Sequence, residues 1–253
     1  MGYLSQLSID GSLKDKMFAT ESLPRSVECL VLFGSQARKQ ADEGSDVDIA
    51  VFARVNSLDQ LTLVKGEICK DIKSEKVNVS AYSTATAELM AREGSLFLWH
   101  LRCEGKILAS RSTWFTTLVK DLMPYTSRKA KLDLDTFSQV TDDIIASLSF
   151  QGITILFEAA TLFAVMRSMG MILTTLKGRP CFGRLEPILY LKDSMGYSFP
   201  LTEGELQLLL HAKLCYSRKA SDLPTPNLRE CLIMAKKVKE INQYLEGVCN
   251  ETI

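Results

Sequence analysis

Two apolar segments separated by a glycine-serine break constrain the fold of this chain more than any other feature. Residues 27–33, VECLVLF, form a compact apolar run, and residues 45–52, SDVDIAVF, alternate with a period of two. Both patterns are typical of β-strands. The second segment carries Asp46 and Asp48, and two carboxylates on an otherwise apolar strand cost free energy to desolvate. Something must offset that cost.

The rest of the first hundred residues continues this alternation of strands and helices. A helical pattern follows at 57–73, a third strand over 76–82, and then a helix and a short closing strand within 94–109. After residue 111 the strand pattern ends, and helical patterns occupy 113–123, 133–149, 152–176, 184–195, 203–218 and 227–246. The chain is therefore predicted to have an α+β fold. We expect a small mixed-sheet domain over 1–110 and an all-α helical bundle domain over 111–253.

Composition limits the classes of partner and location. Thirty basic and thirty acidic residues give a formal net charge of zero, which disfavours a nucleic-acid binder held by bulk electrostatics. Seven scattered cysteines without a C-x-x-C pair indicate reduced core residues, and with no signal peptide at the N-terminus they predict a cytoplasmic protein. Glu158 and Arg167 interrupt the longest apolar stretch, so a buried helix is expected there and no membrane span.

The break and the carboxylates suggest a joint chemistry. Asp46 and Asp48 project from one face of their strand, where they repel each other unless a cation such as Mg²⁺ lies between them. Gly34 and Ser35 lie where a strand turns into a short helix, and the N–H groups of that helix can bind a phosphate. Arg38, one turn later, can also bind the phosphate oxygens. Taken singly, these features also fit an ordinary turn and an exposed strand edge. In this order they favour phosphoryl or nucleotidyl transfer.

The motif GSQAR followed by SDVDIAV resembles the nucleotidyltransferase family of the DNA polymerase β superfamily, particularly its small bacterial members. Residues 94–109 are similar to the segment that closes this domain. The helical remainder resembles the bundles that follow it in aminoglycoside nucleotidyltransferases and in HEPN-like domains. The resemblance therefore covers about residues 25–110 by motif and the rest by architecture alone.

The resemblance implies an enzyme that moves a nucleoside monophosphate from an NTP, with ATP expected, to an acceptor hydroxyl and releases pyrophosphate. Asp46 and Asp48 would bind Mg²⁺, with two ions expected. The expected nucleotide-binding residues are Gly34, Ser35, Arg38 and Ser45. The acceptor would be a small molecule, a protein or an RNA end, and a homodimer or a toxin partner is possible for such a chain.

The sequence departs from this family at Asn78. The family supplies a third carboxylate from the next strand, and Asn cannot accept a proton near neutral pH and is a weaker metal ligand. Three explanations stay open: another carboxylate substitutes, the acceptor needs no base, or the protein binds nucleotide without turnover. The carboxylates available to substitute are Glu75, Glu88, Glu104 and Glu158.

The third explanation gives an alternative function. In it, the chain is a catalytically impaired, nucleotide-binding regulatory or antitoxin-like module that acts through a protein partner. Ribonuclease activity in the helical domain is not expected, because neither His100 nor His211 follows an arginine at the Arg-x₄₋₆-His spacing of HEPN ribonucleases. Both histidines are interpreted as satisfied helix residues.

Overall fold

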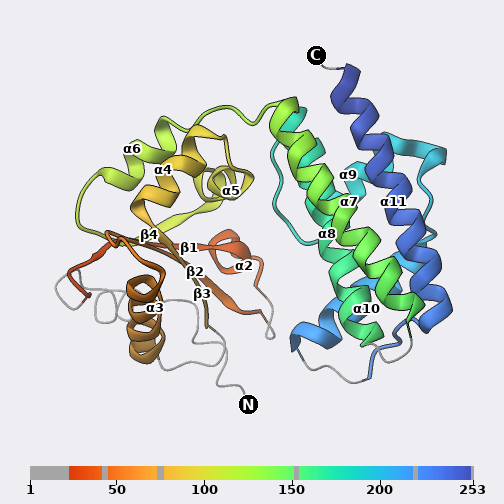
Figure 1. Cartoon of the computed structure of the whole chain (residues 1–253), viewed down its shortest axis with the longest axis horizontal. Helices are drawn as coiled ribbons and strands as arrows, with labels where there is room; N and C mark the ends of the chain where they lie inside the picture. Colours follow the sequence, from red (N-terminus) through yellow and green to blue (C-terminus); the bar gives the residue numbers. More distant parts are fainter. Residues whose placement is uncertain (1–22, 42–44, 73–76, 151–153, 219–221, 252–253) are drawn as a thin grey trace. The chain divides into compact units, whose positions relative to one another are not determined.

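The computed structural model describes residues 23–41, 45–72, 77–150, 154–218 and 222–251, and the statements below concern these residues. The chain divides into two compact units, Met1–Pro124 and Tyr125–Ile253 (Figure 1). The first combines a four-stranded sheet with helices, and the second is helical in its described residues. The predicted α+β fold is therefore confirmed.

The sheet of the first unit is mixed, with strand order β3-β2-β1-β4. Strands β1 (Val27–Phe33) and β2 (Val47–Ala53) are antiparallel neighbours, as are β1 and β4 (Lys106–Ser110). Strand β3 (Val77–Ser83) runs parallel to β2. The short helix α2 (Gly34–Arg38) follows β1 and lies in the connection to β2. The Gly34-Ser35 break therefore lies at the end of β1.

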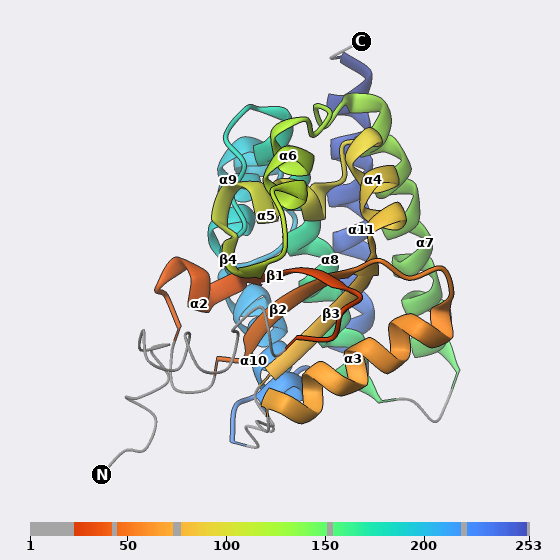
Figure 2. The ribbon, with the colours of Figure 1, turned by 90° about the vertical axis from the view of Figure 1, so that its left-hand side faces the viewer.

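Helices cover both faces of this sheet. Helix α3 (Leu58–Ile72) lies on one face, and α4 (Thr84–Arg92), α5 (Leu96–Glu104) and α6 (Trp114–Lys120) lie on the other (Figures 1 and 2). The strands send alternate side chains to the two faces, as period-two patterns require. Leu30 and Val51 pack with the α3 residue Val64, whereas Val31 and Phe52 pack with the α5 residue Leu98.

Helix α6 belongs to the sheet unit. Phe115 and Leu118 are buried in the same core cluster as Phe52, and the compact unit runs on to Pro124. The predicted boundary at 110/111 had placed this helix with the bundle. Helix α6 has only seven residues, and a helix this short is stabilised mainly by burying its apolar face. In this chain that face is buried against the sheet core.

The second unit consists of α7 (Ser127–Ser149), α8 (Ile155–Leu176), α9 (Glu186–Met195), the 3₁₀ turn η1 (Gly196–Ser198), α10 (Glu203–Arg218) and α11 (Leu228–Glu251). Helix α8 contacts α7, α9, α10 and α11. Its length and hydropathy would also suit a membrane span, but 61% of that apolar window is buried inside the structure. Helix α8 is therefore a core helix of this unit, as its sequence predicted.

All seven cysteines are free, and four of them are buried. Burial raises the pKa of the Cys29 thiol to about 12 and that of Cys231 to about 12, so both stay protonated at neutral pH. Cys69 and Cys103 are exposed. The expectation that the cysteines are core residues is wrong for these two, because each lies on the outer face of an amphipathic helix.

Candidate nucleotide site

The turn after β1 requires glycine at position 34. Gly34 has a left-handed backbone, with φ at 73°, a conformation that costs free energy for residues with a Cβ. A Cβ at this position would also lie 2.5 Å from Oδ2 of Asp48. The Asp48 carboxylate thus lies directly against the backbone of the turn, although the two residues are 14 positions apart in the sequence.

Helix α2 begins at this glycine without a side-chain cap. The N-cap residue is Phe33, and its phenyl ring has no hydrogen-bond acceptor for the first N–H groups of the helix. Ser35 is half-buried within the first turn. Uncapped N–H groups next to a serine hydroxyl are the donors with which such turns bind anions.

The strand register brings the carboxylates and Asn78 together. Asp48 is the partner of Phe33 on β1 and of Asn78 on β3. Asn78 donates from Nδ2 to Oδ1 of Asp48 over 3.3 Å. Asp46 precedes β2 and is exposed, while Ser45 is buried. One end of the sheet therefore presents the turn, both aspartates and the amide.

The donor chemistry fits one hard cation. Both aspartates supply carboxylate oxygens, which Mg²⁺ prefers, and Asp46 is exposed to receive an ion. Among the described residues, no group of three or more His, Cys, Asp or Glu side chains could hold a metal. An ion at this pair would take its remaining ligands from phosphate oxygens and water, as Mg²⁺ commonly does.

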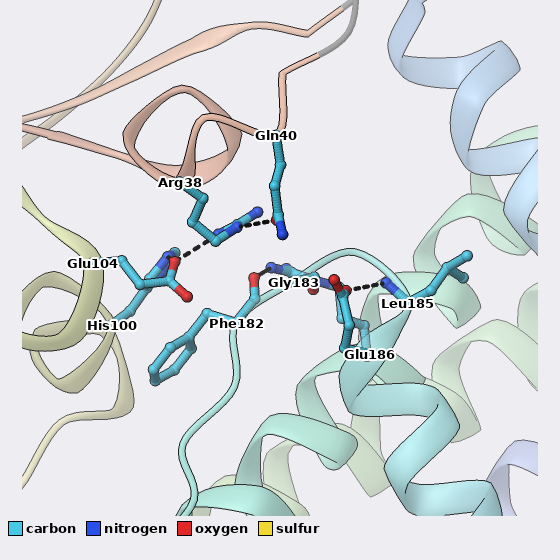
Figure 3. A network of polar contacts seen from close by, with 9 residues as sticks. Arg38, Gln40, His100, Glu104, Phe182, Gly183, Leu185 and Glu186 are labelled. Carbon is cyan, nitrogen blue, oxygen red and sulfur yellow. Dashed lines mark hydrogen bonds and ion pairs between the residues drawn. The ribbon is translucent and has the colours of Figure 1, made fainter.

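Arg38 ends helix α2 and is held by two partners (Figure 3). Its Nε donates to Oε1 of Gln40 over 2.9 Å, and its Nη1 donates to Oε2 of Glu104 over 2.6 Å. His100 precedes Glu104 by one turn of α5, and its Nε2 lies 3.0 Å from the same Glu104 oxygen. The ionised carboxylate can only accept, so Nε2 carries the hydrogen in this bond.

The pKa of Glu104 reflects two opposing effects. Burial raises the pKa of this carboxyl, whereas the hydrogen bonds and positive charge from His100 and Arg38 lower it, and the net pKa lies below the ordinary value. Glu104 is thus a charged partner of Arg38. Its carboxylate is engaged, which makes it a poor substitute for a general base.

The other carboxylates that the sequence offered are engaged elsewhere or lie outside the described residues. Glu88, on α4, accepts from Nε1 of Trp114 over 3.1 Å. Glu158, on α8, is buried in the second unit and accepts from Ser147 over 2.6 Å. Glu75 is the one outside the described residues. The catalytic assignment of Glu158 stays a prediction, and the structure gives this carboxylate a hydrogen bond from Ser147 within the second unit.

Arg167, the second charged residue of α8, is likewise bonded inside the second unit. It donates from Nε to the Gly183 carbonyl over 2.7 Å and from Nη2 to the Phe182 carbonyl over 2.6 Å, and Figure 3 shows this loop with Glu186 beside it. Arg167 therefore fixes the loop that precedes α9.

Sequence reasoning missed the pairing of Arg38 with Glu104. The two residues lie 66 positions apart, and no local pattern relates them. A signal was present in the sequence, because His100 and Glu104 have the i,i+4 spacing that places side chains on one helix face. The interpretation of His100 as a satisfied helix residue is confirmed by its bond to Glu104.

Comparisons with known proteins identify the first unit. The family model described as Polymerase beta, Nucleotidyltransferase matches residues 16–113. No curated protein sequence matches the chain. Among solved structures, the crystal structure of spectinomycin adenyltransferase AAD(9) from Enterococcus faecialis with ATP and spectinomycin is similar, with a TM-score of 0.51 and 11% identity over 92% of this chain and 97% of that chain. At this identity the likeness concerns the fold. Residues 16–113 of the chain therefore match the Polymerase beta nucleotidyltransferase family.

Proposed function

We propose that the chain is an Mg²⁺-dependent nucleotidyltransferase that uses ATP. The oxygen of an acceptor hydroxyl forms a bond to the α-phosphorus, the bond from that phosphorus to the bridging β-oxygen breaks, and pyrophosphate leaves. The hydroxyl proton passes to solvent or to a base. The products are the adenylylated acceptor and pyrophosphate, so atoms and charges balance.

One observation carries this proposal: the Asp48 carboxylate lies against the Gly34 turn. A Cβ at Gly34 would come within 2.5 Å of Oδ2 of Asp48, so a phosphate on the turn would lie beside the carboxylates. Two anionic groups at such a distance need a cation between them. This juxtaposition favours a metal-bound triphosphate over a simple anion site.

Each residue of the site has a proposed task. The N–H groups after Gly34 and the Ser35 hydroxyl bind the terminal phosphates, and Arg38 adds positive charge next to them. Asp46 and Asp48 hold Mg²⁺, which supplies charge neutralisation to the triphosphate and the leaving pyrophosphate when it is bound. Ser45, the remaining residue expected to bind nucleotide, is buried next to Asp46.

Asn78 favours a single ion at the aspartate pair. The resemblance to the family predicts two ions, the second of which needs the third carboxylate. Asn78 is neutral and its amide nitrogen points at Asp48, donating over 3.3 Å. We infer that the pair holds one ion and that transfer relies on alignment of the acceptor, which can contribute much of the rate in such reactions.

A small polar molecule with hydroxyl groups is the proposed acceptor. The similar solved structure holds ATP and spectinomycin, and its fold extends through both parts of this chain. The formal net charge of zero disfavours a long RNA as acceptor. A protein hydroxyl and an RNA end are the acceptors to test next.

Labelled ATP tests this proposal. Purified protein is incubated with Mg²⁺ and ATP labelled either in the α-phosphate or in the γ-phosphate, together with aminocyclitol and aminoglycoside acceptors. The α-label should move to the acceptor, and the γ-label should appear in pyrophosphate. Asp48→Asn should abolish both, whereas Asp59→Asn on α3 should match the wild type. Transfer of the γ-label to an acceptor would indicate a kinase and contradict the proposal.

Asn78 also favours a second candidate, a nucleotide-binding module that regulates a protein partner. In that case the chain binds Mg²⁺ and ATP, forms a stoichiometric complex with another protein and transfers no label. Size-exclusion chromatography of the chain purified from its native host, with and without ATP, distinguishes this case from the enzyme, which needs no such partner for turnover. The localisation expected for both candidates is the cytoplasm.

A further inference from the structure

Helix α5 holds both ends of the phosphate turn. The turn runs from Phe33, the last residue of β1, to Arg38, the last residue of α2. His100 contacts Phe33 edge-to-face, with ring centroids 5.5 Å apart and an interplanar angle of 88°. Glu104, one helical turn later, bonds Arg38. Two side chains from one helix therefore contact the residue before Gly34 and the last residue of α2.

His100 and Glu104 are also hydrogen-bonded to each other. His100 Nε2 donates to Oε2 of Glu104 over 3.0 Å, and the same oxygen accepts from Arg38 over 2.6 Å. The side chains are mostly buried, with exposed fractions of 15% for Arg38, 17% for Glu104 and 12% for His100. Ion pairs with this burial and charge-assisted geometry hold their side chains more firmly than exposed pairs do.

Arg38 keeps donors for a ligand in this arrangement. A guanidinium has five N–H donors in a fixed plane, and the bonds to Gln40 and Glu104 use Nε and one hydrogen of Nη1. An arginine whose plane is already fixed loses less conformational entropy when it meets a phosphate. The same bonds fix the C-terminal end of α2, and with it the backbone N–H groups of the turn.

We propose that Glu104 and His100 are positioning residues that set the affinity for the nucleotide by fixing Arg38 and the Gly34–Arg38 turn. This inference rests on the proposed function of the turn and concerns two residues of the closing segment 94–109, outside the GSQAR and SDVDIAV motifs. Glu104 acts through Arg38, and His100 acts through Glu104 and Phe33. Neither residue is proposed to touch the reacting atoms.

A double-mutant cycle tests whether Glu104 acts through Arg38. The affinity for ATP is measured in Mg²⁺ by titration calorimetry for wild type, Glu104→Gln, Arg38→Ala and the double variant, at a temperature where circular dichroism shows each to be folded. Glu104→Gln should weaken binding roughly tenfold, in the range of residues that orient a ligand-binding group. In the Arg38→Ala background the same change should have little further effect.

Further variants separate positioning from general destabilisation. His100→Phe keeps the ring contact with Phe33 and removes the N–H, so it should weaken ATP binding less than Glu104→Gln does. Glu104→Asp should recover part of the lost affinity. Glu67→Gln on the exposed side of α3 is the matched control and should bind as the wild type does. If Glu104→Gln does not fold, the same cycle is run with His100→Phe and Arg38→Ala.

The outcomes are distinct. Unchanged ATP affinity in Glu104→Gln, or an equal loss with and without Arg38, overturns the inference. In both cases the proposed function still stands if the wild type binds ATP and Asp48→Asn does not. A folded wild type that binds no ATP in Mg²⁺ instead overturns the proposed function, and the inference with it.

Discussion

Asn78 donates a hydrogen bond from Nδ2 to Oδ1 of Asp48, across the parallel pairing of β3 with β2. The amide occupies the register position at which a third carboxylate is expected in this superfamily. A carboxylate here would repel Asp48 unless a cation lay between them. The amide instead stabilises the Asp48 carboxylate through this hydrogen bond, and the site has one anionic group fewer than the superfamily pattern predicts.

Asn78→Asp should change the number of ions bound. The variant restores a third carboxylate, so Mn²⁺ binding in the presence of a non-hydrolysable ATP analogue should rise from one ion to two. The measurement is free Mn²⁺ by electron paramagnetic resonance. Transfer of the α-label should also increase, by roughly 10²–10⁴-fold if a general base was missing.

Asn78→Ser is the control for this prediction, because it removes the amide without adding charge. It should keep one ion and show no gain in transfer. Two ions bound by the wild type would contradict the single-ion account. Equal transfer by wild type and Asn78→Asp would mean that no base is needed at this position.

Gly34→Ala should destabilise the first unit and impair nucleotide binding. The left-handed backbone alone costs alanine about 1–2 kcal/mol, and the new Cβ would meet Oδ2 of Asp48 at 2.5 Å. Gly178→Ala is a matched control, since Gly178 has φ at 71° and a Cβ added there would meet nothing within 4 Å. Urea unfolding should show a larger loss for Gly34→Ala, and ATP affinity should fall in that variant alone. Equal losses of stability in the two variants would mean that contact between the new Cβ and Asp48 contributes nothing to the loss.

The contribution of Glu104 to stability should depend on pH. The pKa of this carboxyl is below its ordinary value of 4.5 because the bonds from His100 and Arg38 outweigh the effect of burial. A carboxyl with a lowered folded-state pKa stabilises the fold above its unfolded pKa, and this stabilisation is lost as the pH falls through the folded value. The difference in melting temperature between wild type and Glu104→Gln should therefore be constant near neutral pH and shrink below about pH 4.5.

Thermal unfolding from pH 3 to pH 7 measures this difference, with Glu67→Gln as the control for loss of an exposed carboxylate. The control should differ little from the wild type across the range. A difference for Glu104→Gln that grows on acidification would show that the ion pair with Arg38 does not stabilise the fold.

Local patterns predicted the parts of the site that lie within one stretch of chain. The period-two strand 45–52 and the apolar strand 27–33 correspond to β2 and β1. The Gly34-Ser35 break is a turn in which Gly34 has a left-handed backbone. The third strand predicted over 76–82 corresponds to β3, in which Val79 packs toward α3 and Tyr82 packs on the opposite core cluster. These features depend on residues a few positions apart.

Features that depend on distant contacts were not predictable. Helix α4 (Thr84–Arg92) was missed because it buries Ala87 and Ala91, whose small side chains leave a weak periodic signal. The placement of α6 depends on its packing against Phe52, far away in sequence. The bond between Arg38 and Glu104 joins two elements through the tertiary fold, so the sequence offered Glu104 as a candidate base instead.

The affinity of the folded chain for ATP in Mg²⁺, measured by titration calorimetry for wild type and for Asp48→Asn, tests the central claim most directly. Asp48 lies between the turn and Asn78, so its replacement removes the proposed ion ligand without removing a core side chain. The account predicts that the wild type binds one ATP in Mg²⁺ and loses most of this affinity in EDTA. Asp48→Asn should bind weakly in both conditions, while Asp59→Asn should match the wild type. Equal, metal-independent binding by wild type and Asp48→Asn would contradict the account.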